Sequence, residues 1–81
     1  MADQWEMCEV SYDFNHVFFY TPMGATGFMF EAFLKKYDPS FNSLGKTEDS
    51  RLVICKLLSE SWEPFAEDEH EYFFRRKHQG E

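Results

Sequence analysis

The stretch His16-Val17-Phe18-Phe19-Tyr20-Thr21 decides how this 81-residue chain folds. β-branched and aromatic residues fill it, and such residues favour extended structure. Successive side chains of a strand point to opposite faces, so Val17 and Phe19 share one face while Phe18 and Tyr20 share the other. Both faces of this strand are therefore apolar, and a single layer of helices can cover only one of them.

The residues before this strand predict its partner. Residues 5–12 alternate in polarity, which is typical of a second strand. The turn residues Asp13, Phe14 and Asn15 separate the two strands and predict a hairpin. Alternation places Cys8, Val10 and Tyr12 on one face and Trp5, Met7, Glu9 and Ser11 on the other. On the far side, Thr21-Pro22-Met23-Gly24 predicts a turn that ends the aromatic strand.

Beyond Gly27 the apolar period changes to that of a helix. Phe30, Phe33, Leu34 and Tyr37 recur at the spacing of one helix face, and Asp38-Pro39 ends that helix. Residues 38–47 predict a polar loop. A second helix is expected to begin near Thr47, with acids against its positive end. Its apolar residues, which predict the core helix, are Leu52, Val53, Ile54, Cys55, Leu57 and Leu58.

Two further strands are predicted after the second helix. Residues 62–66 form the first, which Pro64 restricts to an edge or a bulge, and residues 70–76 form the second. The order β-β-α-α-β-β predicts an α+β fold with a four-stranded, mainly antiparallel sheet and two helices packed on one face. At 9.7 kDa the whole of residues 1–81 is expected to form a single domain. Residues 1–4 and 77–81 are expected to be flexible termini.

Charge and cysteine content narrow the classes of function. The net charge of −7 disfavours nucleic acid and acidic membranes as partners. The main basic cluster, Arg75-Arg76-Lys77-His78, is expected to be solvated charge at a strand end. No apolar run approaches a membrane span and no stretch resembles a signal peptide. The distant Cys8 and Cys55 are expected to be buried, reduced thiols, so we expect a cytoplasmic protein.

Three short motifs form a frame at the two ends of the chain. They are Trp5-Glu6 at the first strand, Trp62-Glu63 directly after a Leu-rich helix, and Tyr72-Phe73-Phe74-Arg75-Arg76. The frame resembles a group of small bacterial domains of unknown function. Ser61 departs from that pattern, which has Gly there, and the match does not extend over residues 22–46. The resemblance implies the same fold and carries no activity over.

The polar residues do not form a recognisable reactive site. His16, His70 and His78 lack the spacing of metal ligands, and residues 67–71 lack the glycine of a calcium loop. The serines have no nucleophile-elbow context, and both cysteines lie among apolar neighbours. We therefore expect no metal, no cofactor and no enzymatic activity.

The surplus of aromatic residues is the main indication of function. Aromatic residues make up 20% of the chain, more than a core of this size needs to hide. We expect a non-enzymatic protein–protein interaction module that docks through an aromatic sheet face or edge onto another protein or onto itself, as a possible homodimer. The expected partner-binding residues are Trp5, Phe18, Tyr20, Tyr72, Phe74, Arg75 and Arg76.

Two other functions remain open at this stage. One is an acidic inhibitor that mimics nucleic acid through the carboxylates of Asp3, Glu6, Glu9, Asp13, Glu48, Asp49 and residues 67–71. The other is a small-ligand-binding domain with its pocket between the sheet and the helix at residues 30–37.

Overall fold

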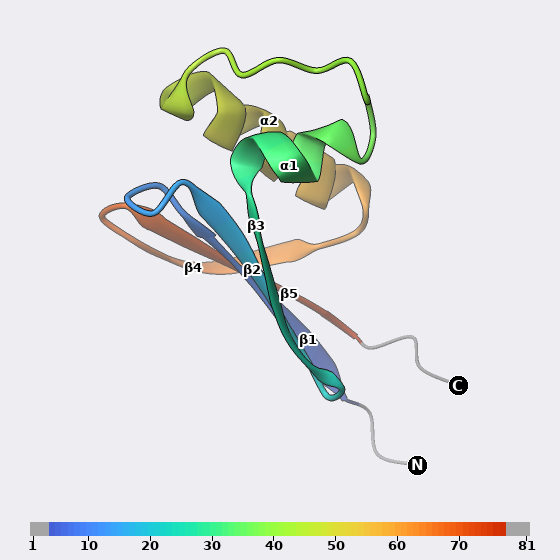
Figure 1. Cartoon of the computed structure of the whole chain (residues 1–81). Helices are drawn as coiled ribbons and strands as arrows, with labels where there is room; N and C mark the ends of the chain where they lie inside the picture. The colour runs from blue at the N-terminus through green and yellow to red at the C-terminus, as the bar shows by residue number, and fades with distance from the viewer. Residues whose placement is uncertain (1–3, 78–81) are drawn as a thin grey trace.

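Five antiparallel strands form one sheet, and two helices lie against one of its faces (Figure 1). The computed structural model describes residues 4–77. The strands follow the spatial order β3-β2-β1-β5-β4, so the N-terminal and C-terminal hairpins join through β1 and β5. The elements are β1 (Trp5–Ser11), β2 (His16–Thr21), β3 (Gly24–Met29), α1 (Phe30–Lys35), α2 (Lys46–Ser59), β4 (Glu63–Asp68) and β5 (Glu71–Lys77).

The α+β class, the antiparallel sheet and the two helices are confirmed, but the expected four strands are wrong. A fifth strand, β3, occupies Gly24–Met29 and pairs with β2 along its whole length. It begins at Gly24, the last residue of the turn expected to end the aromatic strand, and its two glycines give it no strand signal. Gly27 has a packing reason: a Cβ there would lie 2.9 Å from Cδ1 of Phe18 on the paired strand.

The core lies between the sheet and the helices. Cys8 and Val10 of β1 and Val17 of β2 are fully buried, as their alternation predicts. The rest of the buried apolar set is Phe30, Phe33 and Leu34 of α1, Val53 and Leu57 of α2, Trp62, and Phe74 of β5. Leu52 and Leu58 lie on the outer side of α2 and are exposed.

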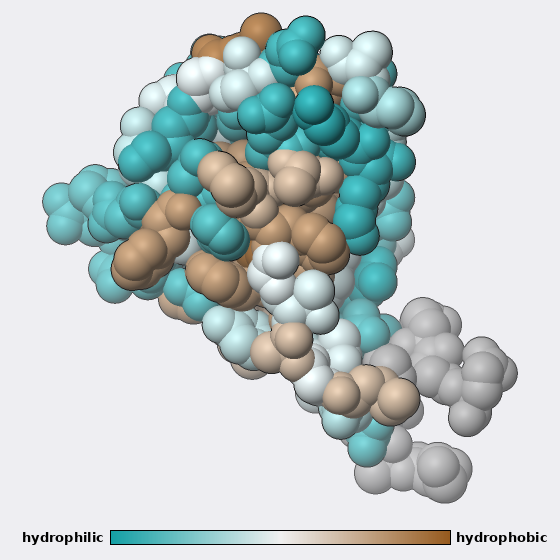
Figure 2. Space-filling view, viewed as in Figure 1, coloured by the Kyte–Doolittle hydropathy of each residue, from teal (hydrophilic) through white to brown (hydrophobic). Residues whose placement is uncertain are grey.

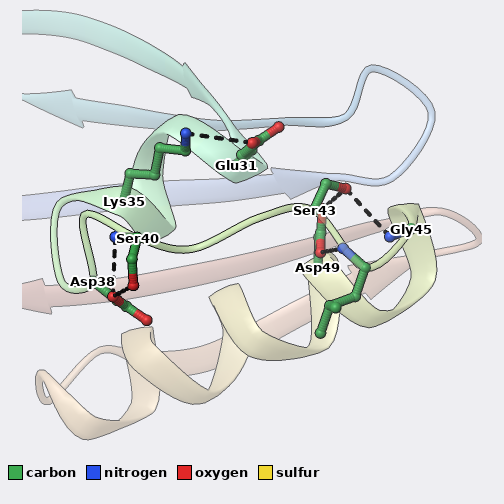
Figure 3. A network of polar contacts seen from close by, with 8 residues as sticks. Glu31, Lys35, Asp38, Ser40, Ser43, Gly45 and Asp49 are labelled. Atoms are coloured by element: carbon green, nitrogen blue, oxygen red, sulfur yellow. Dashed lines mark hydrogen bonds and ion pairs between the residues drawn. The ribbon is translucent and has the colours of Figure 1, made fainter.

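The loop between the helices is held by side chains rather than by regular structure (Figure 3). Asp49, which is buried near the start of α2, accepts hydrogen bonds from the hydroxyl of Ser43 and the backbone N–H of Leu44. At the other end of the loop, Asp38 accepts hydrogen bonds from the N–H and the hydroxyl of Ser40. These bonds fix a segment that has almost no buried apolar side chains.

The end of α2 is a Schellman motif. The N–H of Trp62 donates to the carbonyl of Leu57, and the N–H of Ser61 donates to the carbonyl of Leu58. Ser61 itself has φ 72°, in the left-handed region. The buried side chains of Trp62 and Leu57 supply the apolar contact that accompanies this motif.

One expectation about the cysteines is wrong. Cys8 is buried under the helices, but Cys55 is exposed. The buried face of α2 contains Val53 and Leu57, one turn apart, and a helical residue two positions after Val53 points away from that face.

Within residues 4–77, neither helix is long and apolar enough to cross a membrane.

Candidate functional site

The candidate site is the face of the sheet opposite the helices, which we call the open face (Figure 1). Strand pairing sets Met7 of β1 between Tyr20 of β2 and Arg75 of β5, and sets Glu9 between Phe18 and Phe73. Residues on the helix side alternate with these, so every second side chain of a strand lies on the open face, except at the register shift in β4. Its principal residues are Trp5, Met7, Glu9, His16, Phe18, Tyr20, Phe65, Phe73 and Arg75.

Arg75 is held in place by three neighbours on the open face. Its guanidinium lies 4.9 Å from the ring centre of Trp5 and 5.4 Å from that of Phe65. Its Nε donates to Oε1 of Glu63 at 3.3 Å. Stacking on rings restricts the long side chain before any partner arrives, so less conformational entropy remains to be lost on binding. Lys77 adds a second cation 5.7 Å from the Trp5 ring.

Two carboxyl groups lie beside the aromatic residues of the open face. The hydroxyl of Tyr20 donates to Glu9 at 3.4 Å. A hydrogen bond between Glu9 and Glu71 raises the pKa of Glu71 above its ordinary value, because the two acids share a proton more easily than they both ionise. The His16 ring stacks on Phe18 at 5.6 Å between ring centres. The open face therefore combines apolar side chains with carboxyl groups on neighbouring positions of the central strands.

Four of the seven expected partner-binding residues come together, and three do not. Trp5, Phe18, Tyr20 and Arg75 share the open face. The other three lie on the helix side, because they alternate with Phe73 and Arg75 along β5. They are Phe74, which is 2% exposed in the core, Tyr72, which borders the start of α2, and Arg76.

The side chain of Arg76 is held by contacts within the chain. Its Nε donates to Glu6 at 2.9 Å, its guanidinium lies 4.4 Å from the ring centre of Trp62, and one terminal nitrogen donates to the carbonyl of Glu60 at 3.0 Å. Glu6 is nearly buried. Arg76 therefore joins β1, β5 and the end of α2, and its charge is satisfied within the chain.

Three apolar residues of the open face were not among the expected partner-binding residues, namely Met7, Phe65 and Phe73. Met7 shares its face with Trp5 by simple alternation, so that signal was available in the sequence. Phe73 requires knowledge of which residues of β5 face the same way as Trp5, and only the β1–β5 register supplies it. Phe65 lies in β4 at a shift in register between Pro64 and Ala66, which simple alternation does not predict.

A pocket of about 320 Å³ lies on the helix side, between the sheet and α1. The ammonium of Lys36 lies 4.0 Å from the ring centre of Phe28 at this pocket. Five aromatic side chains line it, namely Phe19, Phe28, Phe33, Tyr37 and Trp62. Its volume is at the lower limit of ligand pockets in proteins.

The carboxylates of the acidic-inhibitor hypothesis are not all available at the surface. Glu6 and Asp49 are buried and bonded within the chain. Asp13 pairs with His70 at 3.0 Å, which connects the tips of the two hairpins. Asp3 and His78 lie outside the described residues, as does most of the two termini that were expected to be flexible.

The thiol of Cys8 does not have the surroundings of a nucleophile. Burial raises the pKa of the Cys8 thiol to about 12, and the nearby Arg76 offsets this only in part. Cys55 is accessible, beside Leu52 and Lys56 on the outer side of α2.

Comparison with known proteins finds no family model, curated protein or solved structure that matches this chain. The resemblance drawn from the three terminal motifs therefore stays a prediction.

Proposed function

We propose that this protein is a non-enzymatic interaction module that docks its open face onto another protein. The observation that supports this most strongly is Arg75, stacked between Trp5 and Phe65 on a sheet face that no helix covers. Tryptophan, tyrosine and arginine dominate the binding energy of protein interfaces. Apolar groups gathered on an uncovered face normally mark a binding site.

The chemistry of the open face defines the partner it fits. Trp5 is 47% exposed, Tyr20 42% and Met7 39%, so each offers apolar surface while it remains anchored in a strand. The side chain of Arg75 is 43% exposed and bonds Glu63 through Nε, so its terminal nitrogens can bind a partner carboxylate or carbonyl. The partner is therefore a protein with an apolar patch next to a hydrogen-bond acceptor.

Tyr20 and Tyr72 form a matched pair for the test. They are 42% and 39% exposed, both lie in strands, and they point to opposite faces of the sheet. Tyr20→Ser should weaken partner binding by about 1–2 kcal/mol, which is roughly 5- to 30-fold, whereas Tyr72→Ser should leave affinity unchanged. Circular dichroism shows whether both variants fold.

The assay begins with affinity capture from the native host at 0.15 and 1 M salt, using the wild type and both variants as baits. Binding of the purified partner is then measured by calorimetry. Aromatic docking should persist at 1 M salt, because screening weakens mainly exposed charges. A partner that is lost at 1 M salt and binds Tyr20→Ser normally would support carboxylate mimicry and contradict docking by the open face.

The aromatic pocket supports a second candidate function, binding of a small planar acid. Phe19 and Phe33 offer ring surface, and Lys36 places a cation at the same pocket. When 2-naphthoate is titrated into the protein and monitored by NMR, the amide signals of α1 should shift in the wild type. The shifts should be smaller in the Lys36→Met variant. Shifts that are absent, or equal in both proteins, would count against this pocket as an anion-binding site.

A further inference from the structure

The two edges of the sheet are unlike each other. The outer strand β4 contains Pro64, a shift in register next to it, and the acids Glu63, Glu67 and Asp68. Proline, bulges and charge are the devices by which proteins keep an edge strand from pairing with another chain. The other outer strand, β3, has the sequence Gly-Ala-Thr-Gly-Phe-Met and contains none of these devices.

The edge at β3 is also open to solvent. All its residues except Phe28 are exposed, and it is the last strand of the sheet. Figure 2, in which β3 lies toward the viewer, shows mainly brown to white surface along this strand. Met29 is 49% exposed and Met23, in the adjoining turn, is 88% exposed.

The hydrogen-bond pattern shows which backbone groups of β3 point outward. Phe30 donates its N–H to the carbonyl of Asn15, so these two residues form a hydrogen-bonded pair. Such pairs alternate along an antiparallel ladder, and the β2–β3 register therefore assigns Phe28, Thr26 and Gly24 to bonds with β2. The N–H and C=O groups of the intervening residues, Ala25, Gly27 and Met29, point away from the sheet.

We propose that β3 pairs with β3 of a second copy of this chain, antiparallel, with Gly27 on the two-fold axis. In this register Ala25 lies opposite Met29 of the second copy, and Gly27 lies opposite Gly27. By symmetry, Met29 also lies opposite Ala25 of the second copy. Each of these three pairs exchanges two backbone hydrogen bonds, so the pairing supplies about six. A shift of the register by two residues loses one pair.

A second copy suits this edge for two reasons. The strand itself has no charged residue, so its own side chains place no like charges opposite each other, despite the net charge of −7. On the helix side, Thr26 lies opposite Phe28 of the second copy, and a β-branched residue facing an aromatic one is a favourable cross-strand pair. The strand is thus uncharged and pairs favourable side-chain types with those of its own copy.

Pairing would also enlarge the open face. The two-fold axis between antiparallel neighbours is perpendicular to the sheet, so both open faces lie on the same side. Five strands about 4.8 Å apart, with about six residues of 3.3 Å each, make a face of about 480 Å² in projection. A typical interface buries about 800 Å² per partner, and two joined faces reach that size. The role of this enlarged face in docking rests on the proposed function, whereas the pairing of β3 does not.

The first test uses matched lysine variants at the two edges. Ala25 and Ala66 are both exposed and lie in the outer strands β3 and β4. Molar mass by light scattering and sedimentation, from 10 μM to 1 mM, should show a dimer for the wild type. Ala25→Lys should raise the dimer dissociation constant at least tenfold, whereas Ala66→Lys should leave it unchanged. A wild type that is monomeric at 1 mM, or equal effects of the two variants, overturns the proposal.

The second test determines the register. In a Cys55→Ser background, one preparation carries Ala25→Cys and another carries Met29→Cys. Opposed strand residues lie within the 4.4–6.8 Å usual for a disulfide, whereas two copies of Cys at the same position lie about 13 Å apart along the strand. Oxidation of the mixture should link the two preparations, and neither should link to itself. Linkage within a single preparation, or none in the mixture, overturns this register.

Discussion

The left-handed residue at the end of α2 gives a prediction that can be worked out in detail. Ser61 has φ 72° because the Schellman motif requires a left-handed turn there. A residue with a Cβ pays about 1–2 kcal/mol in this conformation. Ser61→Gly removes that strain, but the unfolded chain gains freedom worth about 0.5–1 kcal/mol. The central values differ by about 0.75 kcal/mol, so we expect the free energy of unfolding to rise by about 0.4–1 kcal/mol.

The gain is measurable for a domain of this size. With an m-value of about 1 kcal/mol/M, the urea midpoint should increase by about 0.4–1 M, and the melting temperature by about 2–8 °C. Ser61→Ala is the control, because it removes the same hydroxyl but keeps the Cβ, and should not stabilise. Ser59→Gly, in the last turn of the right-handed helix, should destabilise by about 0.5–1 kcal/mol.

The reasoning fails if Ser61→Gly leaves the urea midpoint unchanged or lowers it, since Ser61 would then have ordinary dihedral angles. It also fails if Ser61→Ala stabilises as much as Ser61→Gly, because the gain would then come from the lost hydroxyl. Either conclusion requires that the wild type, Ser61→Gly and Ser61→Ala have equal m-values.

Two further predictions concern titratable groups. In the native protein Cys55 should react rapidly with a thiol reagent at pH 8 and Cys8 only after unfolding, which single Cys→Ser variants would assign in a colorimetric assay. The second concerns Glu71, whose pKa is raised in the folded state by its hydrogen bond with Glu9. The folded state holds this proton more tightly, so the contribution to stability is fully present below the ordinary pKa of 4.5 and is lost as the pH rises through the raised value. Urea unfolding from pH 4 to 7 should show a smaller fall in stability for Glu71→Gln than for the wild type, and equal falls would count against the shared proton.

Much of the fold could be predicted because local patterns agree with the final structure. The hairpin at residues 5–21, both helices and the edge position of Pro64 follow from periodicity and from the constraints on proline. The strand β3 could not be predicted in this way. Its residues have weak intrinsic preference for a strand, and they form one because β2 offers a free edge and Phe18 covers Gly27.

The candidate site was predictable within strands and not between them. Alternation separated Phe18 and Tyr20 from Val17 and Phe19 correctly. It also separated Phe74 from Phe73, but it could not show which of the two faces the same way as Trp5. Which of the two residues faces the same way as Trp5 depends on the register between β1 and β5. Odd-numbered residues of β1 pair with odd-numbered residues of β5, and a shift of one residue would place Phe74 on the open face instead of Phe73.

The sixteen aromatic residues divide between the buried core and the two faces of the sheet. Of the sixteen aromatic residues, four are in the buried core, namely Phe30, Phe33, Trp62 and Phe74. Several others cover backbone or cations on both faces of the sheet, as Phe18 covers Gly27 and Trp5 covers Arg75. A ring that only filled the core would not need a backbone segment or a cation beside it. On the open face the rings instead hold a cation and leave apolar surface outward, which is the arrangement expected where a second protein completes the packing.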